Sequence, residues 1–379
     1  MAIARQQAVL STVPSGMRPL DIANEVRNIR PAQTTILTLL MGLNKVKAES
    51  REFKINEQAI DPGTVTATAL AANVFTVSTD DVKFVRIGQT LLLNHTTNCL
   101  VTGVNYTTGA VTVDDATGFS ATSVLILGSV GHEELSARPT AVSRIPTQTT
   151  NYCETARDAY GESRWVQTEK HYGGPRKHHN REICMWEHKR FVDRGLWFSK
   201  KLDGTQNSQK LYKTNGILRS ITTNIRTFSA TTVTWDKMRA NITTDTRFSL
   251  SPSLWLSVPR KGLELLEKIV RDKTVPMTYT EAAGIKVGNV GMGNKTLKIF
   301  VIDHFEQGLD DTWILIDPEL IEIVTTKDQV TGQRQWMIEE LNVEDPGTDG
   351  TINVLTSDFG CRLHNEQAHA AWDGAASAA

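Results

Sequence analysis

The sequence predicts a mixed α+β fold that carries a small all-β domain as an insertion. Three observations lead to this class. Residues 61–131 consist of short β-branched runs separated by turn residues, residues 175–201 read as one long helix, and the chain after Gly204 alternates between helix-like and strand-like segments. A chain of 379 residues is long enough for two or three domains, or for one large domain with insertions.

Composition and charge place the chain among ordinary globular proteins. Hydrophobic residues make up 40% and charged residues 22%, which excludes a disordered or fibrous protein. There are 41 Lys and Arg residues against 42 Asp and Glu, which gives a formal net charge of -1. The chain is therefore not a bulk polycation, although this balance does not exclude a local basic patch. Four scattered cysteines do not make a disulfide framework and favour a reducing compartment.

No membrane segment or secretion signal is expected. The longest apolar run near the start, Thr34–Leu43, is about half the length of a bilayer-spanning helix and begins too late for a signal peptide. We therefore expect the protein to stay in the cytoplasm in which it is made.

The β-rich segment, residues 61–131, stands apart in composition because its only basic residues are Lys83 and Arg86. Short runs suited to strands recur at about 8–12-residue spacing. They are Val74–Val77, Thr90–Leu93, Leu100–Val104, Ala110–Val113 and Val124–Leu127. Glycine-containing turns bracket the segment at both ends, so it is predicted to be a compact barrel or sandwich inserted into a loop of the host.

The segments around this insertion read as extended arms. Residues 1–33 contain Pro and Gly without periodicity, and residues 34–46 predict a short apolar helix. Arg51–Ala59 is extended and charged, and residues 132–165 are Thr- and Pro-containing and poor in helix signals. These last two segments are expected to be the outgoing and returning strands of one long hairpin.

The helix candidate at 175–201 carries the clearest electrostatic feature. Its apolar residues do not fall on one face, so we expect contacts from several directions. Across His171–Lys201 eight Lys and Arg face three acidic residues, a local charge of +5. This is either a solvated face with intersubunit ion pairs or an inward surface that meets nucleic acid through phosphates, without base readout. The candidate residues are Arg176, Lys177, Arg181, Lys189 and Arg190.

The second half of the chain predicts alternating helices and strands. Helices are expected at Trp235–Asn241 and Pro259–Lys273, the second of these amphipathic. Strands are expected at Ser253–Val258, Ile285–Val287, Thr296–Ile302, Trp313–Ile316 and Ile321–Thr325. Residues 350–363 predict a final strand pair, and the Ala-rich tail from about Ala370 is expected to fray.

Motifs that would carry chemistry are incomplete. Gly288–Thr296 nearly spells a phosphate-binding loop, but Asn294 stands where the lysine is needed, so a turn is the better interpretation. His132–Ser136 lacks the second histidine of a zinc-protease helix. Cys184 and His188, with His178 and His179 nearby, raise the question of a metal, but neighbouring cations disfavour one. We predict no catalytic residues, no metal and no cofactor, and hence a protein that is not an enzyme.

The order of these pieces resembles the major capsid proteins of tailed double-stranded DNA phages, with their Hong Kong 97-like capsid fold, in a branch with a β-domain inserted in the extended loop. Five stretches carry the resemblance. They are IRPAQTTILTLL at Ile29–Leu40, the returning arm at Ala137–Ser163, RFVDRGLWFSKK at Arg190–Lys201, KTNGI at Lys213–Ile217 and the ending at Thr348–Gly374.

The resemblance implies a division of the chain. Residues 1–50 would form an N-terminal arm with a short helix, and 51–60 with 132–165 the extended loop around the β-rich insertion at 61–131. Residues 166–213 and 346–379 would form the peripheral domain with its spine helix, and residues 214–345 the axial domain. The insertion is expected to project outward as decoration, neighbour contact or reinforcement.

The resemblance also implies a function. The chain would assemble into pentamers and hexamers of an icosahedral shell around double-stranded DNA, held by non-specific phosphate contacts. A separate scaffold, a portal and decoration proteins would be its partners, and it would assemble in the host cytoplasm and reside in the virion. Two alternatives remain: a bacterial nanocompartment of the same fold (encapsulin-like) and a β-rich fibre or adhesin subunit. A third, an enzyme, is left by the motifs above without a nucleophile, metal or cofactor loop.

Overall fold

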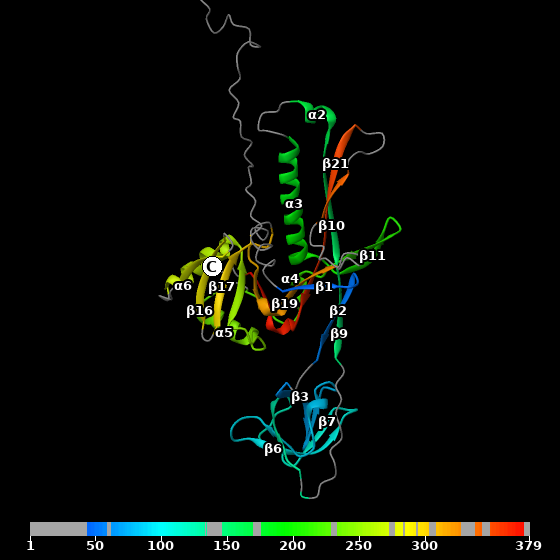
Figure 1. The fold of residues 1–379 in the computed structure, drawn as a ribbon. Helices are drawn as coiled ribbons and strands as arrows, with labels where there is room; N and C mark the ends of the chain where they lie inside the picture. The colour runs from blue at the N-terminus through cyan, green and yellow to red at the C-terminus, as the bar shows by residue number, and fades with distance from the viewer. Residues whose placement is uncertain are drawn as a thin grey trace, which may run out of the picture. The chain divides into compact units, whose positions relative to one another are not determined.

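The computed structural model divides the chain into two compact units, one formed by residues 1–55 with 149–379 and the other by residues 56–148 (Figure 1). The structure describes residues 44–58, 62–132, 134, 146–169, 176–228, 233–272, 277–282, 285–292, 295–302, 308–326, 338–342 and 349–374. The predicted arm at 1–33 and most of the predicted helix at 34–46 lie outside these residues. The last residues of that predicted helix, from Asn44, are described, and they belong to a strand, β1 (Asn44–Ala48). This part of the prediction is therefore wrong.

The smaller unit is a closed six-stranded barrel in the order β3-β4-β7-β6-β5-β8. Alternate side chains point inward and make one core around Phe75, Leu91 and Leu125, as expected for strands with a period of two. Closure leaves this sheet without an unpaired edge. The strands are β3 (Thr64–Ala71), β4 (Val74–Val77), β5 (Gln89–Leu92), β6 (Asn98–Asn105), β7 (Ala110–Val113) and β8 (Val124–Val130), and a short 3-10 helix, η2, covers Val82–Phe84.

A long two-stranded ribbon organises the larger unit. Strand β10 (Glu154–Ser163) pairs antiparallel with β21 (Gly350–Leu363) from Glu154 opposite Phe359 to Ser163 opposite Gly350. Residues 350–363 are therefore one strand, not the predicted pair. At its other edge β21 pairs with β20 (Ile338–Asn342) and β19 (Ile321–Thr326), and β19 pairs in parallel with β1.

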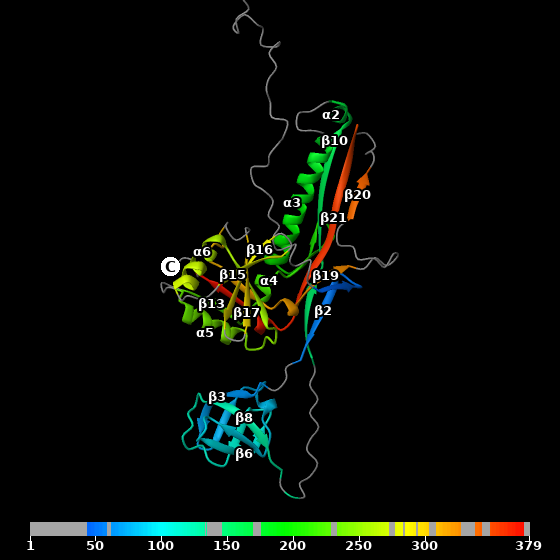
Figure 2. The same ribbon diagram turned by 60° about the vertical axis from the view of Figure 1, so that its left-hand side comes forward.

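Helix α3 (Arg176–Phe198) lies along this ribbon (Figure 2). Cys184, His188, Val192 and Leu196 are buried and follow one another at four-residue intervals, which places them on one side of the helix. Asp193 and Trp197, which lie further round the helix, are buried as well, and α3 also contacts α4, so near its end the helix is packed from more than one direction, as expected. Half of the packed stripe is contributed by a cysteine and a histidine, while the apolar Phe191 is exposed.

A seven-stranded sheet with two helices forms the rest of the larger unit. Its order is β13-β22-β18-β14-β17-β16-β15. Helices α5 (Trp235–Asp245) and α6 (Arg260–Asp272) contribute Met238 and Leu266 to its core. The strands are β13 (Ile225–Thr227), β14 (Ser253–Val258), β15 (Met277–Ala282), β16 (Ile285–Met292), β17 (Lys295–Val301), β18 (Trp313–Ile316) and β22 (Ala370–Asp373).

Two expectations for this sheet need correction. The segment from Ala370 was expected to fray, but it forms an inner strand, β22, between β13 and β18. Its Trp372 is fully buried, with its ring centroid 6.4 Å from that of Trp313. Gly288 and Gly291 belong to β16 and not to the predicted glycine-rich turn, so strand geometry replaces any phosphate-binding loop there.

The predicted hairpin forms in part. Strand β2 (Glu52–Glu57) pairs with β9 (Thr147–Tyr152), and the Cys153 N–H donates to the Arg51 carbonyl at 2.8 Å. The rest of the returning segment, from Glu154, belongs to the ribbon instead. The remaining short elements are α2 (Arg164–Thr168), the hairpin of β11 (Leu202–Gln206) and β12 (Gln209–Lys213), α4 (Ile217–Ser220), and the 3-10 turns η4 (Pro318–Leu320) and η5 (Glu366–Ala368).

Candidate assembly and nucleic-acid surfaces

A buried polar cluster fixes the long helix to the ribbon. His188 is 1% exposed, and its Nδ1 lies 2.5 Å from Asp158 Oδ2 on β10 while its Nε2 lies 2.7 Å from Ser357 Oγ on β21. A carboxylate can only accept, so Nδ1 carries the proton, and in the neutral ring Nε2 accepts from the Ser357 hydroxyl. One side chain thus joins three elements, of which β21 is far from the other two in sequence.

A second cluster ties the base of the hairpin to the body of the larger unit. The Asn151 side-chain amide donates to the Cys361 carbonyl at 2.7 Å, and its Oδ1 accepts from the Asn215 N–H at 2.8 Å. Asn151 and Thr214 are both buried, and the Thr214 hydroxyl accepts from the Cys361 N–H at 3.2 Å. Sequence patterns gave no sign of either cluster, because polar side chains that pair across long sequence distances leave no periodic signal.

The five basic residues predicted as one cluster do not form a single patch. Arg176, Lys177 and Lys189 are exposed, and Arg190 is half-buried. Arg181 is also half-buried and lies about two turns before His188, on the side of α3 that faces the ribbon. Lys189 lies about 20 Å along the axis from Arg176. The positive charge is therefore spread along the helix and over more than one side of it.

The electrostatic setting of α3 remains positive. Asp193, one of its three acidic residues, is buried, and Glu182 is 3.1 Å from the imidazole of His178. The Arg190 guanidinium lies 5.5 Å from the ring centroid of Trp186. Burial, together with the charge of Arg190, lowers the pKa of Arg194 from its usual value. The exposed sides of the helix present cations to any partner.

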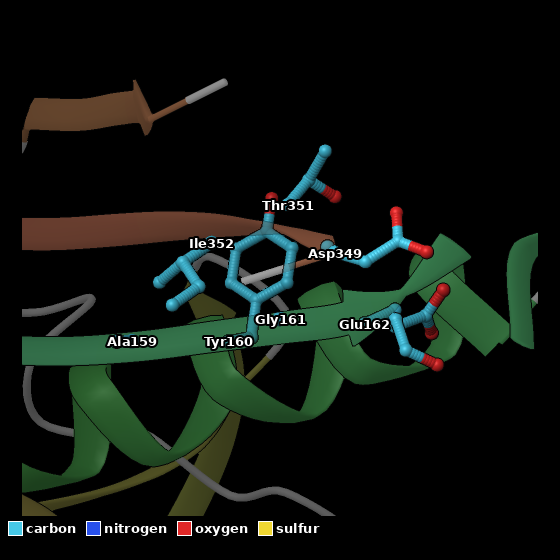
Figure 3. A pocket seen from close by; sticks show the side chains of 9 residues that line it. Ala159, Tyr160, Gly161, Glu162, Asp349, Thr351 and Ile352 are labelled. Atoms are coloured by element: carbon cyan, nitrogen blue, oxygen red, sulfur yellow. The ribbon is translucent and has the colours of Figure 1, made fainter. Parts of the chain in front are cut away.

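A cavity of about 390 Å³ opens near the far end of the ribbon (Figure 3). It is lined by residues 159–163 of β10, by Asp349 and by residues 350–352 of β21, with the Glu162 and Asp349 carboxylates at one end. Both carboxylates have partners, since Asn180 Nδ2 donates to Glu162 at 3.0 Å and Arg164 lies 3.4 Å from Asp349. Two carboxylates repel phosphate, so this hollow does not suit a nucleotide.

The residues considered for a metal are occupied otherwise. His188 is hydrogen-bonded on both nitrogens, and Cys184 packs with Tyr160 and Leu355. In the part of the chain that the structure describes, no group of three or more His, Cys, Asp or Glu side chains could hold a metal ion. None of the helices within the described ranges is long and apolar enough to cross a membrane.

Comparison with known proteins decides the family. A family model described as SU10 major capsid protein matches residues 4–376. The chain belongs to this family. Its role is therefore that of a shell-forming major capsid protein, and the resemblance that the sequence suggested is confirmed. No curated protein matches the chain.

Solved structures support the capsid fold of this family member. It is similar to the capsid of a native GTA particle (9% identity, TM-score 0.51, covering 97% of this chain and 99% of that one). It is also similar to the structure described as Gordonia phage Cozz (11% identity, TM-score 0.51, covering 97% of this chain and 98% of that one). The capsid of the cyanophage P-SCSP1u is similar as well (9% identity, TM-score 0.50, covering 98% of both chains). The predicted α+β capsid fold is confirmed.

Proposed function

We propose that the chain assembles into pentamers and hexamers that close an icosahedral shell around the double-stranded DNA of a tailed phage. The family match over residues 4–376 carries this proposal. We expect a separate scaffold, a portal and decoration proteins as its partners. The subunit would assemble in the host cytoplasm and end in the virion.

The hairpin of β2 and β9 supports a role among many copies. Its base packs on the body through Phe53 and Asn151, but Thr147, Gln148 and Thr149 of β9 are exposed, and a sheet of only two strands is marginally stable in water. A neighbouring subunit that covers it would supply the missing contacts. We assign this hairpin to the extended loop, α3 to the spine of the peripheral domain and the seven-stranded sheet to the axial domain. We assign the barrel to the outer surface of the shell.

We assign the basic residues of α3 to the inner surface of the shell, where they would face the DNA. Arg176, Lys177 and Lys189 are exposed, and contacts with DNA phosphates need an excess of cations and not one shaped patch. The same residues would otherwise form intersubunit ion pairs, which is the second reading of this surface.

Charge reversal separates these two roles. The double variant Arg176→Glu with Lys177→Glu should lower the DNA retained per particle several-fold while particle yield stays near that of the wild type. The matched control is Lys83→Glu with Arg86→Glu, which changes the net charge equally at exposed positions of the barrel and should leave both quantities unchanged. Loss of particles in the first variant would assign Arg176 and Lys177 to subunit contacts.

Nuclease protection tests the proposal as a whole. Particles purified after expression with the phage packaging components should hold double-stranded DNA that nuclease does not digest. Particles that enclose a protein cargo and no protected DNA would instead indicate a nanocompartment of the same fold.

A further inference from the structure

The loop between α5 and β14, residues 246–252, presents an apolar side chain to solvent. Leu250 is 98% exposed, the highest value for any large hydrophobic residue in the described ranges, and the nearby Phe248 is 46% exposed. Single exposed hydrophobic residues are common on protein surfaces. What distinguishes Leu250 is how firmly its backbone is held.

The residues on either side of Leu250 are fastened to one buried carboxylate. Ser249 and Ser251 are both buried, and their hydroxyls donate to Asp317 Oδ2 at 2.6 Å and Oδ1 at 2.7 Å. Asp317 is fully buried and also accepts from the Glu319 N–H at 3.0 Å. Such an arrangement fixes the direction in which the side chain between the two serines points.

Two further contacts hold the rest of the loop. Lys295 Nζ donates to the Ser249 carbonyl at 2.8 Å, and Asn365 Nδ2 donates to the Phe248 carbonyl at 3.4 Å. The Arg247 guanidinium lies 5.3 Å from the ring centroid of Phe248. The loop is thus tied to β17, to the turn after β18 and to the start of η5, with Leu250 at its outer surface.

We propose that Leu250 is a preorganised anchor that inserts into a neighbouring copy of this chain in the shell. A contact whose backbone is already ordered loses little entropy on binding, and apolar anchors in fitted recesses dominate interface energies. The inference rests on the proposed function, because shell assembly is what brings a second copy to this surface.

A second copy is the occupant that best fits these features. In a closed shell each subunit contacts other copies along its edges, and the same contact recurs in each copy. A lone projecting side chain needs a recess at a different position on its partner, and a head-to-tail contact, the type that closes rings of subunits, can provide one. The ordered 246–252 loop also suits a folded neighbouring subunit as its partner, because neither surface has to rearrange on contact.

The test compares two substitutions in the full-length chain. Leu250→Asp should reduce the fraction of protein in megadalton particles about tenfold or more, because a charge cannot enter an apolar recess. Its circular dichroism and melting temperature should match those of the wild type, since the side chain is exposed in the subunit. Leu250→Met, which keeps volume and apolarity, should assemble normally. Leu250→Asp that assembles as well as the wild type would overturn the anchor alone.

Photo-crosslinking identifies the occupant directly. A chain with p-benzoylphenylalanine at position 250 should, when irradiated in particles, give covalent dimers whose crosslinked peptides both come from this chain. Crosslinks to another protein, or none, would contradict the inference. A wild-type chain that forms no particles would overturn the proposed function and the anchor with it.

Discussion

The Nδ1 atom of His188 lies 2.5 Å from Oδ2 of Asp158, with Ser357 Oγ on the other side of the same ring at 2.7 Å from Nε2. This is the order of groups found in Ser-His-Asp hydrolases. Here, however, Ser357 is 2% exposed on an inner strand, so its hydroxyl is not open to a substrate. The arrangement instead joins α3, β10 and β21, the elements on which the shell subunit is built.

Removing this imidazole should destabilise the larger unit strongly. His188→Ala leaves the buried Ser357 hydroxyl without this partner, removes the imidazole N–H that donates to Asp158 and opens a cavity. We expect a loss of about 2–4 kcal/mol in the free energy of unfolding, measured by chemical denaturation. The control is His178→Ala on the same helix, whose exposed pair with Glu182 should contribute less than about 1 kcal/mol. Equal effects of the two variants would contradict this account.

At Gly195, α3 lies close against Phe359 of β21. A Cβ built there would lie 2.7 Å from two ring carbons of Phe359, a fully buried side chain. Helix propensity alone would make Gly195→Ala stabilising by about 1 kcal/mol. We expect the reverse, a loss of about 1–3 kcal/mol from overpacking, seen as a lower melting temperature. Gly291→Ala, where a Cβ would meet nothing within 4 Å, is the matched control, and stabilisation by Gly195→Ala would refute the packing described.

Stability of the larger unit should fall between neutral and mildly acidic pH because of His369. This ring is buried, accepts from the Asp317 N–H and faces the His364 carbonyl. Burial lowers its pKa from 6.5 to about 4, outweighing the His364 carbonyl and the charges of Asp317 and Glu366, which raise it. Between these values the unfolded chain binds the proton and the folded chain does not. Stability is therefore complete above the unfolded pKa and is lost as the pH falls toward 4.

The expected loss between pH 6.5 and pH 5 is about 2 kcal/mol. It is measured as the difference between unfolding free energies at the two pH values. In His369→Asn, which keeps an acceptor for the Asp317 N–H, that difference should shrink by a similar amount. An unchanged pH dependence in this variant would exclude His369 as the source.

The barrel should fold when expressed alone as residues 62–132. Its strands close on themselves, and its core is complete within the unit. A domain of this size supplies a stability of about 3–5 kcal/mol. We expect a cooperative thermal transition and dispersed NMR amide signals. A spectrum typical of an unfolded chain would show instead that the barrel depends on the rest of the protein.

Strands with strong alternation could be predicted from the sequence. Val74–Val77 and Ala110–Val113 were predicted with the bounds that the structure has, because apolar residues alternate with threonine between clear turns. Thr64–Ala71 was missed because its alternating residues are threonine and alanine, which give little contrast in hydrophobicity. The long helix was found from its length and its preceding proline, but its packed side was not, because His188 counts as polar until Asp158 and Ser357 are known.

The C-terminal strand shows a different limit. Ala370 and Ala371 resemble a disordered tail in composition, yet small side chains are what an inner strand between β13 and β18 accommodates. Only the tertiary position of Trp372 against Trp313 explains why this segment is ordered. The same holds for Asp317 and Asn151, whose partners lie dozens to hundreds of residues away in sequence. Local patterns carry no information about such pairs.

The central claim is that this chain completes its structure only as many copies around a hollow. The mass of the purified full-length protein, measured by light scattering with electron microscopy of the same sample, tests it most directly. We predict closed particles in the megadalton range. A monodisperse monomer or small oligomer under all conditions, with the 51–60 and 132–165 segments protected within one subunit, would contradict it.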